Sequence, residues 1–462
     1  MFHSLYPKRR KIVVKKISFE TPPFEIYTNI QEDEDHCFIL DSVVGPEKLA
    51  EYSFIGFDPE LRIQTKGSKL RVEDREGNSV DNREVDEPLK ELEKLVGSMQ
   101  IEDGDSRFTG GAVGYISYDA IRYWESISDR HTSRFNYPDI EMGIYGDGLI
   151  FDHRLRDAYY FHTGENRINK VNELLKRNSL DQFLRYSEPR TNTVRDKYEE
   201  SVLRAKEYID AGDIFQVVLS QRKDFKVNGD LTAFYRSLIE VNPSPYMYHL
   251  KMGSRRIIGS SPEMLVRVEK RRVETFPIAG TRPRVEDVVE NNRLKDELLA
   301  DSKDRSEHVM LVDLARNDVG RISTYGSVSV PELMTVHQYS HVQHIVSRVV
   351  GELAPEYDSY DTLKAVFPAG TVSGAPKIRA MEIIDELETD KRGPYAGAVG
   401  YFSFNGNSDF AITIRTLTSD GQDASIQVGA GIVADSVPEM EWLETEHKAE
   451  GLLKALEKAS GE

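Results

Sequence analysis

The sequence predicts an α+β fold in which large mixed or antiparallel β-sheets pack as a sandwich with flanking helices. Short apolar segments of strand length dominate the first 165 residues. After residue 193, strands and helices alternate irregularly rather than in repeated βαβ units, which disfavours a doubly wound parallel sheet. The hydrophobic fraction is 39%, with 22 Tyr and 19 Phe, and this is enough apolar material for a globular interior.

The N-terminal part is expected to be rich in strands. Apolar residues within 11–30 predict short strands broken by a turn at Pro22 and Pro23, and the spacing over 88–96 predicts a helix. The segment 111–118 resembles 397–404, as expected of two strands that need small residues where another backbone packs closely. Further strands are expected at 38–40, 53–57, 61–63, 110–118 and 148–152.

The C-terminal part is expected to follow a linker over the polar segment 177–192. Apolar residues recur at helical spacing over 194–211, and Gly212 is expected to end that helix. The last helix is expected to begin near Pro438, with Ser436 as its N-cap. A length of 462 residues fits two domains, and we expect a first domain over 1–165 and a second over 193–460.

Charge and cysteine content exclude several classes of partner. Lys and Arg total 60 against 78 Asp and Glu, and the formal charge of −18 disfavours nucleic acid. Cys37 is the single cysteine, so no intrachain disulfide is expected and a reducing, cytoplasmic location fits. No apolar run is long enough to predict a membrane span, and the basic segment 8–16 lacks the apolar stretch of a signal peptide.

Two pairs of carboxylates, each spaced three residues apart, indicate a chemical site. Asp304 and Glu307 form one pair, Glu441 and Glu444 the other, and Lys448 follows one turn later. On a helix this spacing places both carboxylates on one face. Each pair alone is typical of a solvated helix edge. If the two pairs converge, however, they make an oxygen-only site suited to Mg²⁺ with several retained waters.

Small residues and arginines indicate anion binding, with simpler alternatives open. Gly429-Ala430-Gly431 and the segment 368–377 fit either tight turns or backbone nests that approach a carboxylate closely. Arg282 and Arg415 fit either carboxylate clamps or surface ion pairs.

Three histidines lie at helical spacing, at positions 337, 341 and 344. They lack the His-Glu-x-x-His pattern and a neighbouring cysteine, so a zinc site is disfavoured. One of them could still serve as a base.

An ordered series of motifs resembles the chorismate-utilising enzymes, and among them the large subunits of anthranilate synthase. The resemblance runs from about residue 195 to 455, and the N-terminal half resembles the weaker first domain of that family. It implies a chorismate-binding enzyme fold, with 1–165 as a regulatory domain and 193–460 as the catalytic domain. The segments that carry it are 213–218, 259–263, 277–281, 307–318, 370–377 and 429–436.

The resemblance implies a Mg²⁺-dependent lyase that aminates chorismate at C2 and eliminates pyruvate to give anthranilate, the first step of tryptophan biosynthesis. Two positions favour this reaction over those of related enzymes. Water-adding members carry a lysine base where this chain has Gln216, and a neutral amide cannot activate water. Aminodeoxychorismate synthases typically carry a lysine that attacks the ring where this chain has Ala279, so the covalent route is absent.

The resemblance also assigns residues to the substrate and the metal. Glu307 and Glu444 would bind Mg²⁺ directly, with Asp304 and Glu441 acting through water. Asp304 departs from the glutamate usual in the family and has a shorter reach. The ion would hold the ring carboxylate of chorismate. The substrate-binding residues implied are Gly280, Thr281, Thr371, Tyr395, Arg415, Gly429, Ala430, Gly431 and Lys448.

Two residues are implied to transfer protons. Glu263 resembles the general acid that protonates the departing 4-hydroxyl, so burial should raise its pKa and keep it protonated. His344 resembles the histidine implicated in the later elimination of pyruvate, in which loss of the C2 proton restores aromaticity.

Feedback inhibition by tryptophan is a further implication. The family's Asn-Pro-Ser-Pro-Tyr-Met segment is intact at 242–247, whereas its Leu-Glu-Ser segment is Leu40-Asp41-Ser42 here. Asp41 would shorten the acidic arm that meets the amino group of tryptophan. Without the family, 242–245 is a rigid turn. The tryptophan-binding residues implied are Ser42, Pro243, Tyr246, Met247 and Tyr401.

The ammonia must come from elsewhere, because the chain contains no glutaminase. Cys37 lacks the glycine-rich elbow of a nucleophilic cysteine. A partner glutamine amidotransferase subunit, or free ammonium, is therefore expected to supply it. The alternatives are an aminodeoxychorismate synthase component I, which shares the first step, and a non-catalytic tryptophan-sensing subunit.

Overall fold

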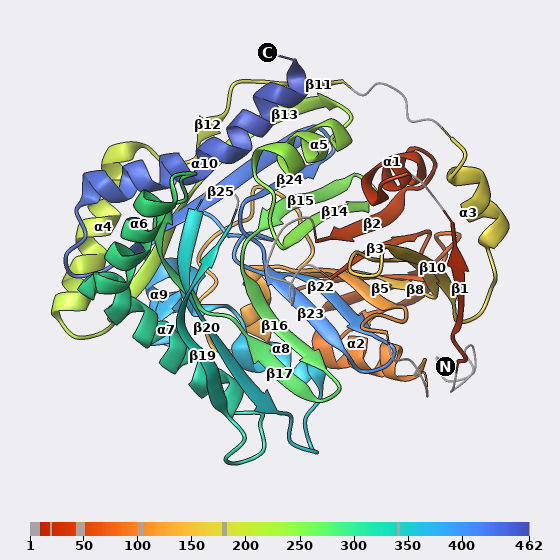
Figure 1. The fold of residues 1–462 in the computed structure, drawn as a ribbon, viewed down its shortest axis with the longest axis horizontal. Coiled ribbons are helices and arrows are strands. Elements are labelled where there is room, and N and C mark those ends of the chain that lie inside the picture. The colour runs from red at the N-terminus through yellow and green to blue at the C-terminus, as the bar shows by residue number, and fades with distance from the viewer. Residues whose placement is uncertain are drawn as a thin grey trace.

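The computed structural model describes residues 10–18, 21–42, 51–99, 101, 106–177, 183–339 and 342–461. Two large sheets form the centre of the molecule and helices flank them, as the sequence predicts (Figure 1). Every pairing between the named strands is antiparallel, and an isolated bridge between Arg10 and Ile101 is parallel. No described helix has the length and apolar character needed to cross a membrane.

The first sheet has 13 strands among the described residues. Along the sheet they are β1 (Val13–Ile17), β10 (Asp157–His162), β9 (Asp147–Asp152), β3 (Tyr52–Phe57), β2 (His36–Asp41), β14 (Tyr246–Met252), β15 (Arg255–Ser261), β24 (Thr416–Asp420), β25 (Asp423–Ile432), β13 (Gln216–Gly229) and β11 (Leu184–Tyr186). The short strands β12 (Arg190–Thr191) and β21 (Gly374–Ala375) also pair with β13.

The second sheet has 12 strands among the described residues. Along the sheet they are β18 (Ile278–Pro283), β20 (Val342–Glu352), β17 (Arg272–Thr275), β16 (Met264–Glu269), β23 (Ser408–Ile412), β22 (Ala398–Ser403), β7 (Gly111–Ile116), β8 (Ile140–Tyr145), β4 (Leu61–Lys66), β5 (Lys69–Asp74) and β6 (Ser79–Glu84). The long strand β19 (Ser329–Gln338) forms a hairpin with β20.

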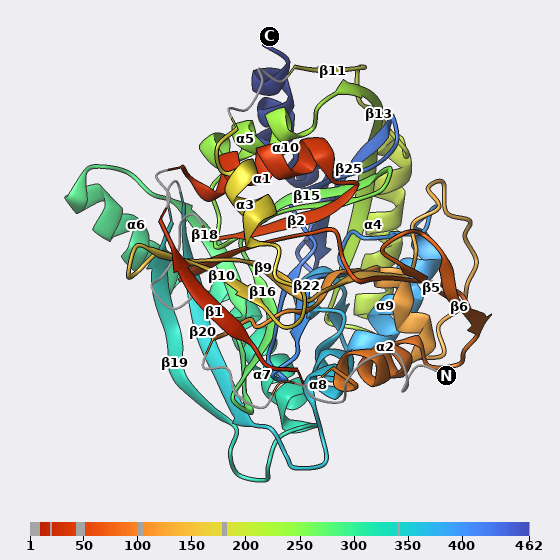
Figure 2. The same ribbon diagram turned by 90° about the vertical axis from the view of Figure 1, so that its right-hand side faces the viewer.

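Helices cover the outer faces of both sheets (Figures 1 and 2). Those in the apolar core of the first sheet are α1 (Pro23–Asp33), α3 (Ile168–Leu174), α5 (Thr232–Val241) and α10 (Pro438–Ser460). Those in the core that covers the second sheet are α2 (Pro88–Gly97), α4 (Arg195–Asp210), α7 (Ser302–Gly320), α8 (Ser359–Val366) and α9 (Lys377–Leu387). The remaining helix α6 (Val288–Ala300) precedes α7, and two 3₁₀ turns are η2 (Tyr118–Tyr123) and η3 (Gly370–Val372).

An aromatic core joins the inner faces of the two sheets. It combines Phe38 and Tyr248 of the first sheet with Tyr115 and Tyr401 of the second. All four side chains are almost fully buried. Burying a large aromatic side chain contributes roughly 1.5–3 kcal/mol relative to leaving it exposed, so this core is a main source of sandwich stability.

The two halves of the chain contribute strands to both sheets. In the first sheet β2 pairs with β14, and in the second β7 pairs with β22. The similar segments of β7 and β22 lie side by side, with Gly114 opposite Gly400. A Cβ at either glycine would lie 2.0 Å from a neighbouring backbone oxygen, which explains the small residues. The boundaries 1–165 and 193–460 stay predictions.

Two local predictions were wrong. Residues 23–30 belong to helix α1 rather than to a strand, because Pro23 occupies the first helical turn and does not act as a breaker. Ile26 and Ile30, four residues apart, then face the core together. The polar segment 177–192 is also not wholly a linker, since β11 and β12 pair with β13 within it.

Candidate active site

Helices α7 and α10 deliver their acidic faces to one cleft of about 600 Å³. Asp304 and Glu307 come from α7, and Glu441 and Glu444 come from α10, so the sequence spacing produces the expected convergence. A small-molecule site usually measures roughly 300–1,000 Å³, which makes the cleft large enough for a substrate.

The first turn of α7 is fixed by its cap. The side chain of Asp301 accepts hydrogen bonds from the backbone N–H groups of Lys303 and Asp304, at 2.9 and 3.0 Å. Asp304 also receives Arg282 Nη1 at 3.0 Å, and Glu307 receives Gln216 Nε2 at 2.9 Å. Both carboxylates are therefore held in place by donors from other elements.

Helix α10 begins at Pro438 as predicted, but the predicted cap was wrong. The N-cap residue is Val437, which has no side-chain acceptor, and the hydroxyl of Ser436 instead accepts the Val433 N–H at 3.0 Å. Proline in the first turn lacks the N–H that a cap would have satisfied.

The acidic face of α10 is partly buried, and Lys448 lies one turn further along the same helix. Burial raises the pKa of Glu441, and the nearby carboxylate of Glu444 raises it further. Lys448 Nζ donates to Glu444 Oε1 at 2.7 Å and to the Gly429 carbonyl at 2.9 Å. Lys448 thus links α10 to the glycine-rich end of β25.

The donor set fits magnesium in its chemistry. All four side chains offer hard carboxylate oxygens, which Mg²⁺ prefers. Within the described ranges, no three His, Cys, Asp or Glu side chains lie close enough together to hold an ion by themselves. Mg²⁺ usually keeps several waters and takes one or two carboxylates plus substrate oxygens, so Glu307 and Glu444 would suffice as direct ligands.

Glycines bring the backbone close to these side chains. Gly280 has φ +63°, and a Cβ there would lie 2.8 Å from Leu298 Cδ1 and 3.1 Å from Asp304 Cγ. A Cβ at Gly431 would lie 2.6 Å from Gln216 Nε2, and one at Gly429 would lie 2.7 Å from the Tyr395 hydroxyl. Gly280 is favoured by its positive φ, and Gly429 by the backbone oxygen of Leu219, 2.9 Å from such a Cβ. At Gly431 the near atom is the end of the Gln216 side chain, which can move.

Glu263 lies beside the cleft, behind Thr371. The Thr371 hydroxyl donates to Glu263 Oε1 at 3.0 Å, and Thr371 itself lines the cleft. Burial raises the pKa of Glu263 to about 8, although the Thr371 hydrogen bond opposes the shift. The carboxyl is therefore largely protonated at neutral pH, as expected of a general acid.

Arg415 and Tyr395 lie at the side of the cleft formed by the end of β25. Burial lowers the pKa of Arg415, and its Nη1 donates to the Lys448 carbonyl at 3.1 Å. Burial raises the pKa of Tyr395 to about 12. Arg415 and Gly431 line the cleft directly, whereas Tyr395 and Gly429 lie in the layer behind them, next to each other.

His344 lies on β20, where it pairs with His337 of β19. The helical spacing of these histidines thus corresponds to a hairpin, which places positions 337 and 344 opposite each other; position 341 lies outside the described residues. His344 Nδ1 is 2.8 Å from the Gly280 carbonyl and 3.1 Å from the Thr281 hydroxyl. Burial lowers its pKa, which favours the neutral ring.

The remaining predicted positions divide between the wall of the cleft and the layer behind it. Gln216, Gly280 and Thr281 line the cleft. Ala279 is buried on β18, and Ala430 is buried on β25.

The structure decides between the two alternatives left open for Arg282 and adds two residues to the cleft. Arg282 pairs with Glu297, Asp301 and Asp304, so its guanidinium serves ion pairs within the chain rather than a free substrate clamp. Lys303 and His447 also line the cleft and were not predicted. Their positions carried a signal, since Lys303 precedes Asp304 and His447 follows Glu444 by three residues on the same helix.

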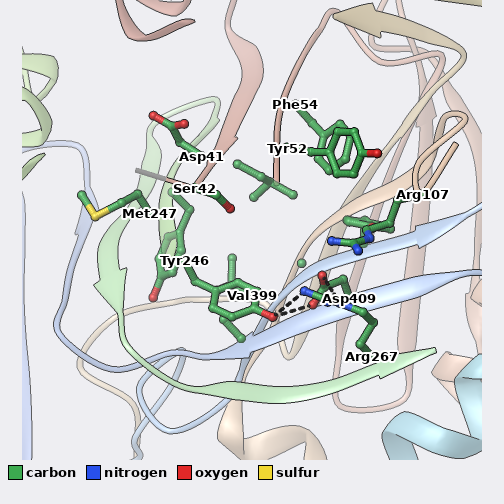
Figure 3. Close-up of a pocket in the computed structure, with 15 residues that line it drawn as sticks. Asp41, Ser42, Tyr52, Phe54, Arg107, Tyr246, Met247, Arg267, Val399 and Asp409 are labelled. Atoms are coloured by element: carbon green, nitrogen blue, oxygen red, sulfur yellow. Dashed lines mark hydrogen bonds and ion pairs between the residues drawn. The ribbon is translucent and has the colours of Figure 1, made fainter. Parts of the chain in front are cut away.

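A second pocket lies between the two sheets (Figure 3). Of the residues predicted to bind tryptophan, Ser42, Tyr246, Met247 and Tyr401 line it, and Pro243 does not. The Ser42 hydroxyl already donates a hydrogen bond within the chain, to the Pro245 carbonyl at 3.0 Å. The free volume is about 40 Å³, which is room for a few waters, so a larger ligand must displace lining side chains.

One wall of this pocket is an ion-pair network that the sequence did not reveal. Arg267 Nε donates to Asp409 Oδ2 at 2.8 Å, and the Tyr246 hydroxyl donates to Asp409 Oδ1 at 3.0 Å (Figure 3). Asp41 was expected to point toward a ligand, but its carboxylate bonds to the hydroxyl of Ser53. Asp41 also lines the pocket, so its role as the acidic arm stays a prediction.

Known proteins share this architecture. The family model described as chorismate binding enzyme matches residues 35–454. Anthranilate synthase component 1 of Methanothermobacter marburgensis is 49% identical over 445 residues, covering 96% of this chain and 95% of that protein. The corresponding protein of Acetivibrio thermocellus is 44% identical, with 97% of each chain covered. The crystal structure of anthranilate synthase component I from Streptococcus pneumoniae is similar with a TM-score of 0.77 and 38% identity, covering 89% of this chain and 94% of that one.

Proposed function

This chain belongs to the family of chorismate-binding enzymes, and from that premise we infer that it acts as component I of an anthranilate synthase. It converts chorismate to anthranilate in tryptophan biosynthesis and is a lyase. The observation that carries the assignment of the site is the convergence of two acidic helix faces on one cleft beside a buried, protonated glutamic acid.

We propose that Glu307 and Glu444 hold Mg²⁺, with Asp304 and Glu441 acting through water. Bound there, the ion would neutralise and orient the ring carboxylate of chorismate. The chain itself supplies the backbone amides near Gly280 and Thr371 for the same carboxylate. The close approach at Gly280 supports this, because it brings the backbone to within contact of Asp304.

The enolpyruvyl carboxylate is assigned to the part of the cleft near the end of β25. Arg415 and Lys448 provide positive charge there, and the backbone of 429–431, with Ala430 at its centre, provides amide donors. Tyr395 supports this wall from behind, since its hydroxyl lies against Gly429. Two separate anion sites would fix the orientation of the ring in the cleft.

Glu263 is assigned the role of general acid for the first step. Ammonia attacks C2, the C4–O bond breaks, and the departing hydroxyl takes the Glu263 proton and leaves as water. Thr371 orients the carboxyl through its hydrogen bond. A pKa of about 8 supports the role, because the group is protonated at neutral pH but can still release its proton.

His344 is assigned to the second step, in which pyruvate leaves. The C3–O bond breaks, and the departing enolpyruvate takes up a proton to become pyruvate. Loss of the C2 proton forms the aromatic ring, and a neutral imidazole can accept that proton. Its lowered pKa and its position beside Gly280 and Thr281 support this assignment.

Two neighbouring residues would direct the reaction toward amination. Gln216 presents an amide to the cleft and bonds to Glu307, so it cannot activate water as a lysine would. Ala279 offers no nucleophile to the ring.

The ammonia would come from a glutamine amidotransferase, the component II that pairs with component I. Tryptophan would inhibit the enzyme by binding the pocket between the sheets, near Ser42, Tyr246, Met247 and Tyr401. Contact of tryptophan with Pro243, which does not line this pocket, stays a prediction. A cytoplasmic location fits this metabolic role.

An assay with chorismate, ammonium and Mg²⁺ tests the function directly. Anthranilate fluorescence should appear, together with one pyruvate per turnover. Accumulation of an aminated, non-aromatic product would assign the chain to aminodeoxychorismate synthesis instead. A protein that binds tryptophan but gives neither product would be a sensing subunit.

A further inference from the structure

A small cavity, distinct from the pocket between the sheets, lies next to the cleft and is separated from it by Thr371. Thr371 and Leu311 line both spaces, whereas Glu263 lines the second one. The other walls are mostly apolar. They come from α7, from the turn at 369–371, from the start of β16 and from Thr275, Pro277 and Val366, and Asp318 provides a further carboxylate. Glu263 therefore has the substrate cleft beyond Thr371 and a separate cavity against its own side chain.

The cavity is suited to hold water. Its volume of about 40 Å³ exceeds the roughly 10–15 Å³ that one water requires. Polar partners are present at Glu263, Thr371 and Asp318. Leu314 and Ala315 are only half-buried, so the wall that α7 gives to the cavity lies next to solvent.

Asp318 is held in a fixed position. Lys377 Nζ donates to Asp318 Oδ2 at 2.7 Å and to the Val366 carbonyl at 2.8 Å. The reaction assigned to the cleft gives this buried ion pair no role. A buried ion pair often contributes little net stability, so stability alone does not explain why this pair lies at the cavity wall.

The chemistry creates a need for such a cavity; this step rests on the proposed function. In the first step Glu263 gives its proton to the leaving hydroxyl, while the ammonium group formed at C2 releases one proton to solvent. The two protons balance overall, but Glu263 is left as a carboxylate. Because its burial favours the protonated form, it must regain a proton before the next turnover.

We propose that Glu263 regains its proton through water in this cavity rather than through the substrate cleft, with Asp318 as a positioning residue for that water. The route would stay open while substrate or product fills the cleft. Proton delivery and substrate exchange would then proceed independently.

The variant Ala315→Leu tests the proposal by filling the cavity from α7. At saturating chorismate and ammonium, kcat should fall about ten-fold, because proton delivery becomes rate-limiting. The KM for chorismate should stay unchanged, and the solvent deuterium isotope effect on kcat should rise. Ala211→Leu makes the identical change at the exposed C-terminal end of α4 and serves as the matched control.

Two results would overturn the proposal. One is a folded Ala315→Leu enzyme with the kcat and isotope effect of the unmodified chain. The other, which does not depend on any variant, is a high-resolution crystal structure in which the cavity contains no ordered water in contact with Glu263. Full activity of Glu263→Gln would instead refute the general-acid role itself, so the two failures can be told apart.

Discussion

The acidic cleft and the pocket between the sheets differ in how far each is formed before a ligand arrives. The cleft offers about 600 Å³, and its carboxylates already face one space. The pocket offers about 40 Å³ between tightly packed aromatic side chains. A substrate can enter the first without rearrangement, whereas a ligand as large as an amino acid must separate side chains in the second.

This difference gives a physical basis for regulation. The pocket is lined by strands of both sheets, with Ser42 and Tyr246 from the first sheet side and Tyr401 and Asp409 from the second. A ligand that opens it must change how the sheets pack. The second sheet also carries β18, which bears Gly280 at the cleft, and β20, which bears His344 next to the Gly280 carbonyl. A ligand can shift activity only through such a difference between two packed states.

The largest expected effect tests the claim that the cleft is preformed for a metal. Glu444→Gln should reduce anthranilate formation roughly 10³-fold or more, because several kcal/mol of transition-state stabilisation depend on the ion. Fluorescence of anthranilate, measured over a range of Mg²⁺ concentrations, checks this. Glu450→Gln, on the same helix and paired with Lys454 at the surface, should be nearly unchanged. Equal activity of both variants would refute the metal assignment.

The next effect concerns the buried acid at the edge of the cleft. Glu263→Gln should slow the reaction about 10²-fold or more, the usual contribution of a positioned acid. In the unmodified enzyme, kcat should fall as pH rises through about 8, because only the protonated carboxyl can donate. The free ammonia concentration must be held constant, since ammonia also titrates with pH. A rate that keeps rising above pH 9 would contradict the assignment.

The pKa shift also predicts a change in stability. Folding raises the pKa of this carboxyl, so its protonated form stabilises the fold. That contribution is complete below the unfolded pKa, near 4.5, and is lost as pH rises through about 8. Glu263→Gln removes this titration. The variant should therefore have a higher melting temperature than the unmodified chain at pH 9, with a smaller difference at pH 5. The same difference at both pH values would argue against a buried, neutral carboxyl.

The third effect separates the two regions. Ser42→Phe places a large ring at the wall of the pocket and should raise the tryptophan concentration needed for inhibition about ten-fold or more. The uninhibited kcat should stay within two-fold of its original value, roughly the scatter expected for a distant site. Ser79→Phe, on the exposed edge strand β6, is the control. A loss of activity without tryptophan would show that the two regions are not independent.

How much of this could be predicted from the sequence depended on the range of the interactions. The spacing of Asp304 and Glu307 is a local property of one helix, and it correctly predicted a shared face. The segment 23–30 was misassigned because Pro23 was taken as a strand breaker rather than as the start of a helix. Turn and helix-start signals share the same residues, so local sequence alone does not separate them.

Contacts between distant residues were not predictable in the same way. The pairing of Arg267 with Asp409 joins positions 142 apart in sequence, and the bond from Tyr246 to Asp409 spans 163 positions. The hydrogen bond between Asp41 and Ser53 was equally hidden, because it depends on how β2 and β3 pair. The family resemblance identified the pocket residues but gave no information on which of them already bind one another.

The smallest expected effect tests whether this network keeps the pocket closed. Tyr246→Phe removes the hydroxyl that bonds to Asp409 and receives Arg267 Nη2 at 3.2 Å, while the ring remains. A hydrogen bond of this kind contributes roughly 0.5–1.5 kcal/mol, and about twice that when charged, so the tryptophan inhibition constant should fall a few-fold as opening becomes easier. Calorimetric titration with tryptophan, beside steady-state inhibition, measures the change. A larger inhibition constant, which means weaker inhibition, would show that the hydroxyl contacts the ligand directly. The pocket would then be preformed like the cleft.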